Sequence, residues 1–372
     1  MCRASGARRT WRLWALPPSS WWTGKARLPW APISGASSRI EEREGMEADS
    51  PENGACAHPA LSGPVLGDIA GSTHEGRYDK VIPEQLIGPH SHFTDDTVLT
   101  CAVAAGLQES LFRLDRAALS CRPEMQAQVV ADLARAIKSY ARRYPQAGYG
   151  SRFRSWVESD TLAGYHSYGN GAAMRCAFAG WYAKTLAEAQ LFGTLTARPT
   201  HNHPDAEEAA AVVAACIFIL QSGGAKKDLL AFARTHYDLS FTLDALRPVH
   251  ACNITGKGTV MVALVCFLES SSFAHALGLA ISMGGDCDTL AAVTGSLAEA
   301  YYAIPGDLLA AGLSRLDDAL LADLRSATHV LRAHGLWRPG TRESAEPLRC
   351  RCTWQEPGAG ANNSLDPRTS RA

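Results

Sequence analysis

The sequence lacks the features that mark several large classes of protein. Its longest purely apolar run, residues 209–220, has 12 residues, whereas a membrane-spanning helix needs about 20. Positive charge is not in excess, since 36 Lys and Arg stand against 37 Asp and Glu. Phosphate recognition depends on a basic excess, so we expect no stable nucleic-acid partner. We therefore predict a globular protein that neither spans a membrane nor binds nucleic acid.

Cysteine pairs with ligand spacing are also missing. The chain has 11 cysteines, an odd number, and no C-x-x-C motif. This pattern argues against a disulfide framework and against a structural zinc site. Most cysteines stand in apolar sequence, where a free thiol behaves as a small buried hydrophobe. We predict free cysteines in a reducing compartment and a cytoplasmic protein.

The two ends of the chain differ from the middle. Five of the nine tryptophans lie in the first 30 residues, and the first 40 carry seven Lys and Arg but no acid. No apolar stretch of signal-peptide length follows, although an acid-free, Arg/Ser-rich start also resembles an organelle transit peptide. We expect residues 1–60 to be a disordered or non-native extension, with Met46 as an alternative start. Residues 338–372 are turn-rich and aperiodic, which predicts a disordered tail.

Between these ends the pattern predicts one compact all-α domain at residues 61–337, which we expect to be a monomer. Alternating β-branched or aromatic runs, which are typical of strands, are absent. Apolar residues instead recur at intervals of three and four. Residues 209–220 are apolar on all sides, which indicates a central helix. The predicted helices are residues 97–109, 123–144, 171–184, 205–221, 227–237, 260–269, 272–282 and 288–303.

Acidic residues precede two of these helices. T-D-D-T stands at 94–97, and D-C-D-T at 286–289 follows the glycine pair 284–285. One interpretation is helix capping, since carboxylates are favoured at a helix start. The other is a cation site, because carboxylate and hydroxyl oxygens suit hard ions such as Mg²⁺, Mn²⁺ or Ca²⁺. If the two segments converge, their four carboxylates predict a site for two ions.

Three further segments interrupt the helical pattern. G-D-I-A-G-S-T-H-E at 67–75 combines glycines with acids. S-Y-G-N-G at 167–171 is either a plain helix-start turn or a source of backbone N–H groups for phosphates, and it is not a Walker motif. T-H-N-H-P-D at 200–205 is a loop whose histidines are either structural or in contact with a ligand.

These five segments, in their order along the chain, resemble the ADP-ribosylglycohydrolase family, which includes the dinitrogenase reductase-activating glycohydrolases. The resemblance runs from about residue 67 to 305. It implies an all-helical fold with a binuclear magnesium or manganese centre in a central cleft. It also implies cleavage of the N- or O-glycosidic bond at C1″ of ADP-ribose, on an ADP-ribosylated protein or small molecule.

The resemblance further implies a role for individual residues. Glu75 would be the catalytic glutamate, in a loop that leads away from the other acids, while Asp68 would support the site. His201 would lie along the ADP-ribose. The diphosphate would be bound by the turn Ser167, Tyr168, Gly169, Asn170 and Gly171. Two Mg²⁺ ions, or Mn²⁺, would be held by Thr94, Asp95, Asp96, Asp286, Asp288 and Thr289.

Two departures from the family pattern leave the substrate open. Residues 252–259 read C-N-I-T-G-K-G-T, where many bacterial members have Cys followed by acidic and small residues, and Cys287 stands where Ser is commoner. Two other functions also stay open: a metal-dependent nucleotide phosphohydrolase, and a catalytically silent ADP-ribose binder or crystallin-like relative. A protein-only pair of carboxylates is the less favoured mechanism, since the metals need the other acids.

Overall fold

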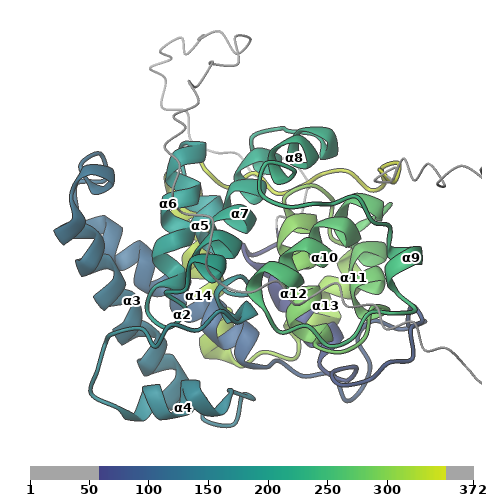
Figure 1. The fold of residues 1–372 in the computed structure, drawn as a ribbon, viewed down its shortest axis with the longest axis horizontal. Helices are drawn as coiled ribbons and strands as arrows, with labels where there is room; N and C mark the ends of the chain where they lie inside the picture. The colour runs from purple at the N-terminus through teal and green to yellow at the C-terminus, as the bar shows by residue number, and fades with distance from the viewer. Residues whose placement is uncertain (1–57, 349–372) are drawn as a thin grey trace, which may run out of the picture. The chain divides into compact units, whose positions relative to one another are not determined.

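The computed structural model describes residues 58–348, and every regular element in this part is a helix (Figure 1). No strand forms among these residues, which contain only two isolated β-bridges, Gly169–Thr255 and Tyr302–Arg342. The predicted all-α fold is confirmed. The α-helices are α1 (Ser62–Gly71), α2 (Asp95–Arg113), α3 (Pro123–Arg143), α4 (Ser151–Glu158), α5 (Ala177–Tyr182), α6 (Leu186–Ala197), α7 (Pro204–Gln221), α8 (Lys226–Ala233), α9 (Leu243–Leu246), α10 (Gly256–Glu269), α11 (Phe273–Ile281), α12 (Cys287–Glu299), α13 (Gly306–Leu313) and α14 (Asp318–Ala333). Two 3₁₀ helices, Leu119–Cys121 and Asn170–Ala172, complete them.

The innermost helices are α1 and α12, which lie directly against each other. Every residue of both is buried. Glycines in α1 make the close approach possible, because a Cβ at Gly67 would lie 2.1 Å from the carbonyl oxygen of Ala291. A Cβ at Gly71 would lie 2.4 Å from the Cα of Asp288. The contact therefore brings the C-terminal end of α1 to the N-terminal end of α12.

Helix α7 is central, as its uninterrupted apolar sequence predicts. It packs against α5, α6, α8, α10 and α12, and residues 212–217 are all buried. In Figure 1, α10, α11 and α12 lie together on one side of these helices, and α3 and α4 lie on the other. None of the helices in residues 58–348 has the length and apolar character that crossing a membrane requires.

Several helices differ from the sequence prediction. Helices α1, α4, α6, α9, α13 and α14 were not predicted. In α1 the reason is visible, since three glycines and one proline in ten residues lower helix propensity and only packing on α12 compensates. The predicted helix 171–184 begins only at Ala177. Before it lies the 3₁₀ helix Asn170–Ala172, whose first residue donates its N–H to the carbonyl of Ile254 at 2.9 Å.

Residues just past the boundary expected at 337 form no helix but are hydrogen-bonded to the helical core. Within the predicted tail, the N–H of Gly340 donates to the carbonyl of Glu299 at 2.8 Å, and that of Leu348 donates to the carbonyl of Leu268 at 2.8 Å. Residues 338–348 are therefore attached to the helical core through the backbone. Residues 1–57 of the extension predicted at 1–60, and residues 349–372 of the predicted tail, lie outside the described residues.

Candidate active site

Asp68, near the end of α1, holds the start of α2. Its side chain is fully buried. One carboxylate oxygen, Oδ2, accepts hydrogen bonds from the backbone N–H groups of Thr94 at 2.8 Å and Thr97 at 3.1 Å. The hydroxyl groups of the same two threonines also donate to Asp68. With four donors satisfied, Asp68 anchors the helix start that carries Asp95 and Asp96, which agrees with the supporting role expected for it.

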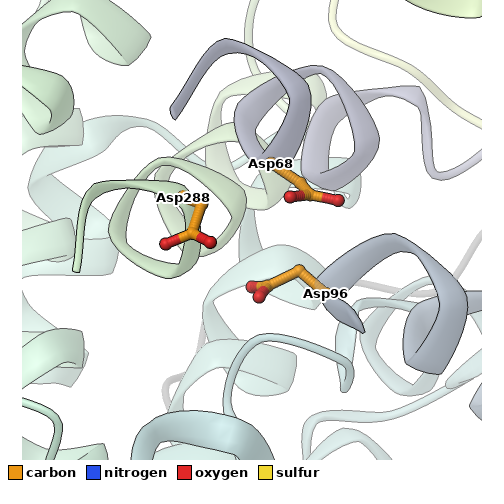
Figure 2. A group of neighbouring side chains, drawn as sticks. All are labelled: Asp68, Asp96 and Asp288. Carbon is orange, nitrogen blue, oxygen red and sulfur yellow. The ribbon is translucent and has the colours of Figure 1, made fainter. Parts of the chain in front are cut away.

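Helix capping and acid convergence both occur at this point. The Thr94 hydroxyl accepts from the N–H of Asp96 at 3.3 Å, so Thr94 is the N-cap of α2. Asp96 nevertheless faces Asp68 and Asp288, and one carboxylate oxygen of each lies within 4.8 Å of the others. Figure 2 shows these three buried side chains directed toward one another from α1, α2 and α12.

A second group of acids adjoins the first. Single carboxylate oxygens of Glu75, Asp286 and Asp288 also lie within 4.8 Å of one another. Asp288 belongs to both groups, so the two acid-rich helix starts meet the condition of convergence on which a cation site depended. Asp95 lines the same cavity but belongs to neither group.

Burial and mutual repulsion make the charged form of these acids unfavourable, and a bound cation would compensate their charge. Burial, followed by the charge of Asp288, raises the pKa of Asp96 well above its usual range. Burial, followed by the charge of Asp286, raises the pKa of Asp288 well above its usual range. Burial raises the pKa of Asp95 to about 7, with Asp68 adding to the shift. Buried charges of one sign are unfavourable unless an opposite charge compensates them.

The donor set fits a hard divalent ion. Oδ1 of Asp96 and Oδ1 of Asp288 are buried and have no hydrogen-bond partner among the described residues. A cation would satisfy both oxygens, and the candidate ligands in both acidic groups are carboxylate oxygens, as Mg²⁺ and Mn²⁺ prefer. The residues present could therefore hold a metal ion.

Neighbouring polar groups orient the acids. The Asn170 side-chain amide donates to Asp286 at 2.7 Å and to the Thr259 hydroxyl at 3.1 Å. The Thr289 hydroxyl donates to Asp96 at 3.1 Å. The turn at 167–171 thus lies beside the acidic groups, and Asn170 is already bonded to one of them.

The loop that carries Glu75 is hydrogen-bonded to the glycine pair 284–285 that precedes α12. The expectation that this loop leads away from the other acids was therefore wrong. The N–H of Gly76 bonds the carbonyl of Gly285 at 2.8 Å, and the N–H of Gly285 bonds the carbonyl of Arg77 at 2.9 Å. Gly284 and Gly285 have φ values of 70° and 82°, a conformation that favours glycine. This pair of hydrogen bonds between the loops places the exposed Glu75 side chain beside Asp286.

These residues line a cavity of about 390 Å³, a size typical of small-molecule sites. It contains most of the predicted site: Glu75, Asp95, Asp96, Ser167, Gly169, Asn170, Gly171, His201, Asp286, Asp288 and Thr289. Two predicted residues do not line it. Thr94 is buried behind Asp96 at the helix cap, and the Tyr168 side chain is 55% exposed, with its ring against His203 at 5.8 Å between centroids.

Sequence reasoning missed part of the cavity wall. Its further lining includes Leu99, Arg152, Phe153, Tyr165, Met174, Arg175 and Ile254. Arg152 and Phe153 belong to α4, for which no helix was predicted. Arg175 follows the glycine-rich turn, and its cationic side chain is completely buried, which the sequence pattern did not indicate. Ile254 brings the atypical stretch 252–259 to the cavity.

Comparisons with known proteins identify the family of this chain. The model of the family described as ADP-ribosylglycohydrolase matches residues 54–337. The curated protein ADP-ribosyl-[dinitrogen reductase] glycohydrolase of Rhodospirillum rubrum is 30% identical over 183 residues, which are 47% of this chain and 60% of that protein. A solved structure, an ADP-ribosylglycohydrolase-related protein complex, matches with a TM-score of 0.51 and 25% identity. That match covers 73% of this chain and 96% of the other. The family model spans most of the described residues, and the chain belongs to the ADP-ribosylglycohydrolase family.

Proposed function

We propose that this protein is a metal-dependent hydrolase that cleaves the C1″ glycosidic bond of an ADP-ribosylated substrate and releases ADP-ribose. The observation that carries the proposal is the pair of acidic groups sharing Asp288 in a cavity of about 390 Å³. Membership of the family supports hydrolysis of an ADP-ribose linkage in general. The chain spans about 60% of the length of the curated relative. The substrate of that relative is therefore not assigned to this chain.

Two divalent ions, Mg²⁺ or Mn²⁺, would be held by the carboxylates of the acid groups. Asp96 and Asp288 are the strongest candidates because each has a buried oxygen without a partner among the described residues. Asp286 would act with Asp288, while Thr94, Asp95 and Thr289 complete the proposed ligand set. When bound, the ions would neutralise these acids, orient the ribose hydroxyls and a water molecule, and lower the pKa of that water.

Glu75 is proposed as the acid/base group. Hydrolysis forms a bond between a water oxygen and C1″, breaks the bond from C1″ to the leaving nitrogen or oxygen, and transfers a proton to the leaving group. Positive charge develops on the ribose during this step. The Glu75 carboxylate lines the cavity, is exposed to solvent and lies beside Asp286 and Asp288. It can therefore accept a proton from water and deliver one to the departing group.

The turn at 167–171 and His201 are proposed to bind the ADP-ribose. Two backbone donors of the turn are already engaged, since the N–H of Gly169 bonds the Ser167 hydroxyl at 3.2 Å and that of Asn170 bonds Ile254. The Ser167 hydroxyl accepts in its bond and keeps its own hydrogen for a ligand. We propose that the Ser167 hydroxyl contacts the diphosphate. The cytoplasmic location and the monomeric state stay predictions from the sequence.

The function is tested with a panel of arginine-, serine- and acetyl-linked ADP-ribose substrates, each assayed with Mg²⁺, with Mn²⁺ and with a chelator. Free ADP-ribose and free phosphate are measured separately, and Asp288→Asn is the matched control. Release of ADP-ribose that requires a divalent ion and disappears in the variant would support the proposal. Release of phosphate would indicate a nucleotide phosphohydrolase, and ADP-ribose binding without any product would indicate a silent binder.

A further inference from the structure

His201 is connected to a fully buried arginine through a single hydroxyl group. Nη2 of Arg175 donates to the Thr200 hydroxyl at 2.7 Å and to the carbonyl of Thr196 at 3.3 Å. The same hydroxyl oxygen lies 2.7 Å from Nδ1 of His201. Arg175 and Thr200 have no exposed surface, and His201 is 7% exposed. The three side chains therefore form a chain of hydrogen bonds that ends at the cavity.

The position of each hydrogen in this chain follows from what each group can do. A guanidinium only donates, so the Thr200 oxygen accepts from Arg175. The hydroxyl's own hydrogen then needs an acceptor, since a buried unpaired donor costs free energy. In residues 58–348 the remaining partner of this hydroxyl is Nδ1 of His201. Nδ1 must accept, and the neutral imidazole then carries its hydrogen on Nε2.

The imidazole is also held in its neutral form. Burial lowers the pKa of His201 well below its usual value, and the nearby charge of Arg175 lowers it further. Nε and Nη1 of Arg175 have no hydrogen-bond partner among the described residues. A cation bonded to the Thr200 oxygen polarises the hydroxyl and makes it a better donor to Nδ1.

The Nε2 edge of the ring faces the glycine turn of the cavity. A Cβ at Gly171 would lie 3.0 Å from Nε2, and one at Gly169 would lie 3.4 Å from it. Because neither residue has a side chain, Nε2 is left accessible from the cavity that His201 lines. Ser167 is held close by, since its N–H donates to the carbonyl of Thr200 at 3.3 Å.

We propose that Arg175 and Thr200 are positioning residues that hold His201 as the Nε2–H tautomer, so that it donates a hydrogen bond to an oxygen of the bound nucleotide. The identity of the ligand rests on the proposed function, whereas the tautomer is a property of the protein alone. In this proposal Arg175 and Thr200 act on the ligand through His201.

The tautomer is read from long-range ¹H–¹⁵N correlation spectra of the full chain labelled with ¹⁵N in its 12 histidines, recorded without ligand. The His201 signals are assigned by their loss in His201→Gln. We expect an unprotonated Nδ1 and a protonated Nε2. Thr200→Val keeps the side-chain shape and the backbone carbonyl but removes the hydroxyl, so both ring signals should shift. Thr200→Ser restores the hydroxyl and should restore the wild-type spectrum.

Affinity for ADP-ribose, measured by calorimetry in Mg²⁺, gives the second readout. The Gln side chain places an amide nitrogen near the Nε2 position, whereas Asn places it near Nδ1. His201→Gln should therefore bind more tightly than His201→Asn. Thr200→Val should lose about three- to tenfold in affinity, the effect of one hydrogen bond, and Thr200→Ser should recover it.

A protonated Nδ1 in the wild-type protein would overturn the proposal. A Thr200→Val variant with an unchanged ring spectrum would overturn it as well. If the wild-type protein binds no ADP-ribose, the proposed function fails, yet the ligand-free spectrum still confirms or refutes the tautomer. The two failures are thus distinguishable.

Discussion

Replacing Asp288 with Asn separates the role of this residue in metal binding from its role in folding. Asp288 is 4% exposed and contributes to both acidic groups. Its pKa is raised by burial first and by Asp286 second. Asn has nearly the same size but no charge, so the substitution removes repulsion and one ligand together.

We expect the stability of the variant to change in opposite directions with and without metal. In a chelator at neutral pH, Asp288→Asn should be at least as stable as wild type, because a buried, repelled carboxylate is gone. At a Mg²⁺ concentration about 100 times the dissociation constant, the wild-type protein should gain about 2.7 kcal/mol. For a domain of this size that gain corresponds to a rise of roughly 5–10 °C in melting temperature. The variant should show almost none of it.

Thermal unfolding with and without Mg²⁺ measures both effects, with Asp68→Asn as the control. The amide introduced by this control substitution would turn a side-chain N–H toward donors that Asp68 now satisfies, including the backbone N–H of Thr94. Each donor left unpaired costs about 1–3 kcal/mol, so the control should be destabilised in either condition. Undiminished Mg²⁺ stabilisation in Asp288→Asn would refute the metal assignment.

Three further predictions concern Glu75, the N-terminal segment and a buried glutamate. Glu75→Gln should lower turnover by about 10²–10⁴-fold in a steady-state assay, and near-normal turnover would exclude the acid/base role. Calorimetry should show less than about a tenfold change in ADP-ribose affinity, whereas complete loss would make Glu75 a ligand. A chain that starts at Met46 should keep its melting temperature and activity, and a large drop in either would show that residues 1–45 stabilise the domain. Burial raises the pKa of Glu299 from 4.5 to about 8, against the effect of the backbone N–H groups at the start of α1. Between these values the unfolded chain loses a proton that the folded chain keeps, so this group's contribution to stability falls by about 1.4 kcal/mol per pH unit as pH rises. The free energy of unfolding, measured in urea from about pH 5 to pH 8, should fall less steeply with pH in Glu299→Gln than in the wild-type protein. An equally steep fall in the variant would contradict the raised pKa.

The sequence by itself determined the fold class and the family, and it named about half of the residues that line the cavity. Helical periodicity and the absence of strand patterns are local properties, and they predicted the all-α domain correctly. Paired acids at two helix starts, together with three other ordered segments, were enough to identify the family. Convergence of Asp96 with Asp288, 192 positions apart, could be expected from these patterns because oxygen ligands for one ion must meet.

Only the tertiary structure decided how the acids are supported. Asp68 bonds Thr94 and Thr97 across 26 and 29 positions, and no local pattern specifies such a contact. The glycines of α1 disfavour a helix by propensity, yet α1 forms because those glycines let it lie on α12. The connection from Arg175 to His201 likewise depends on burial, which the sequence pattern did not reveal. Side-chain roles in this site arise from long-range packing, because packing determines which donors and charges lose contact with water.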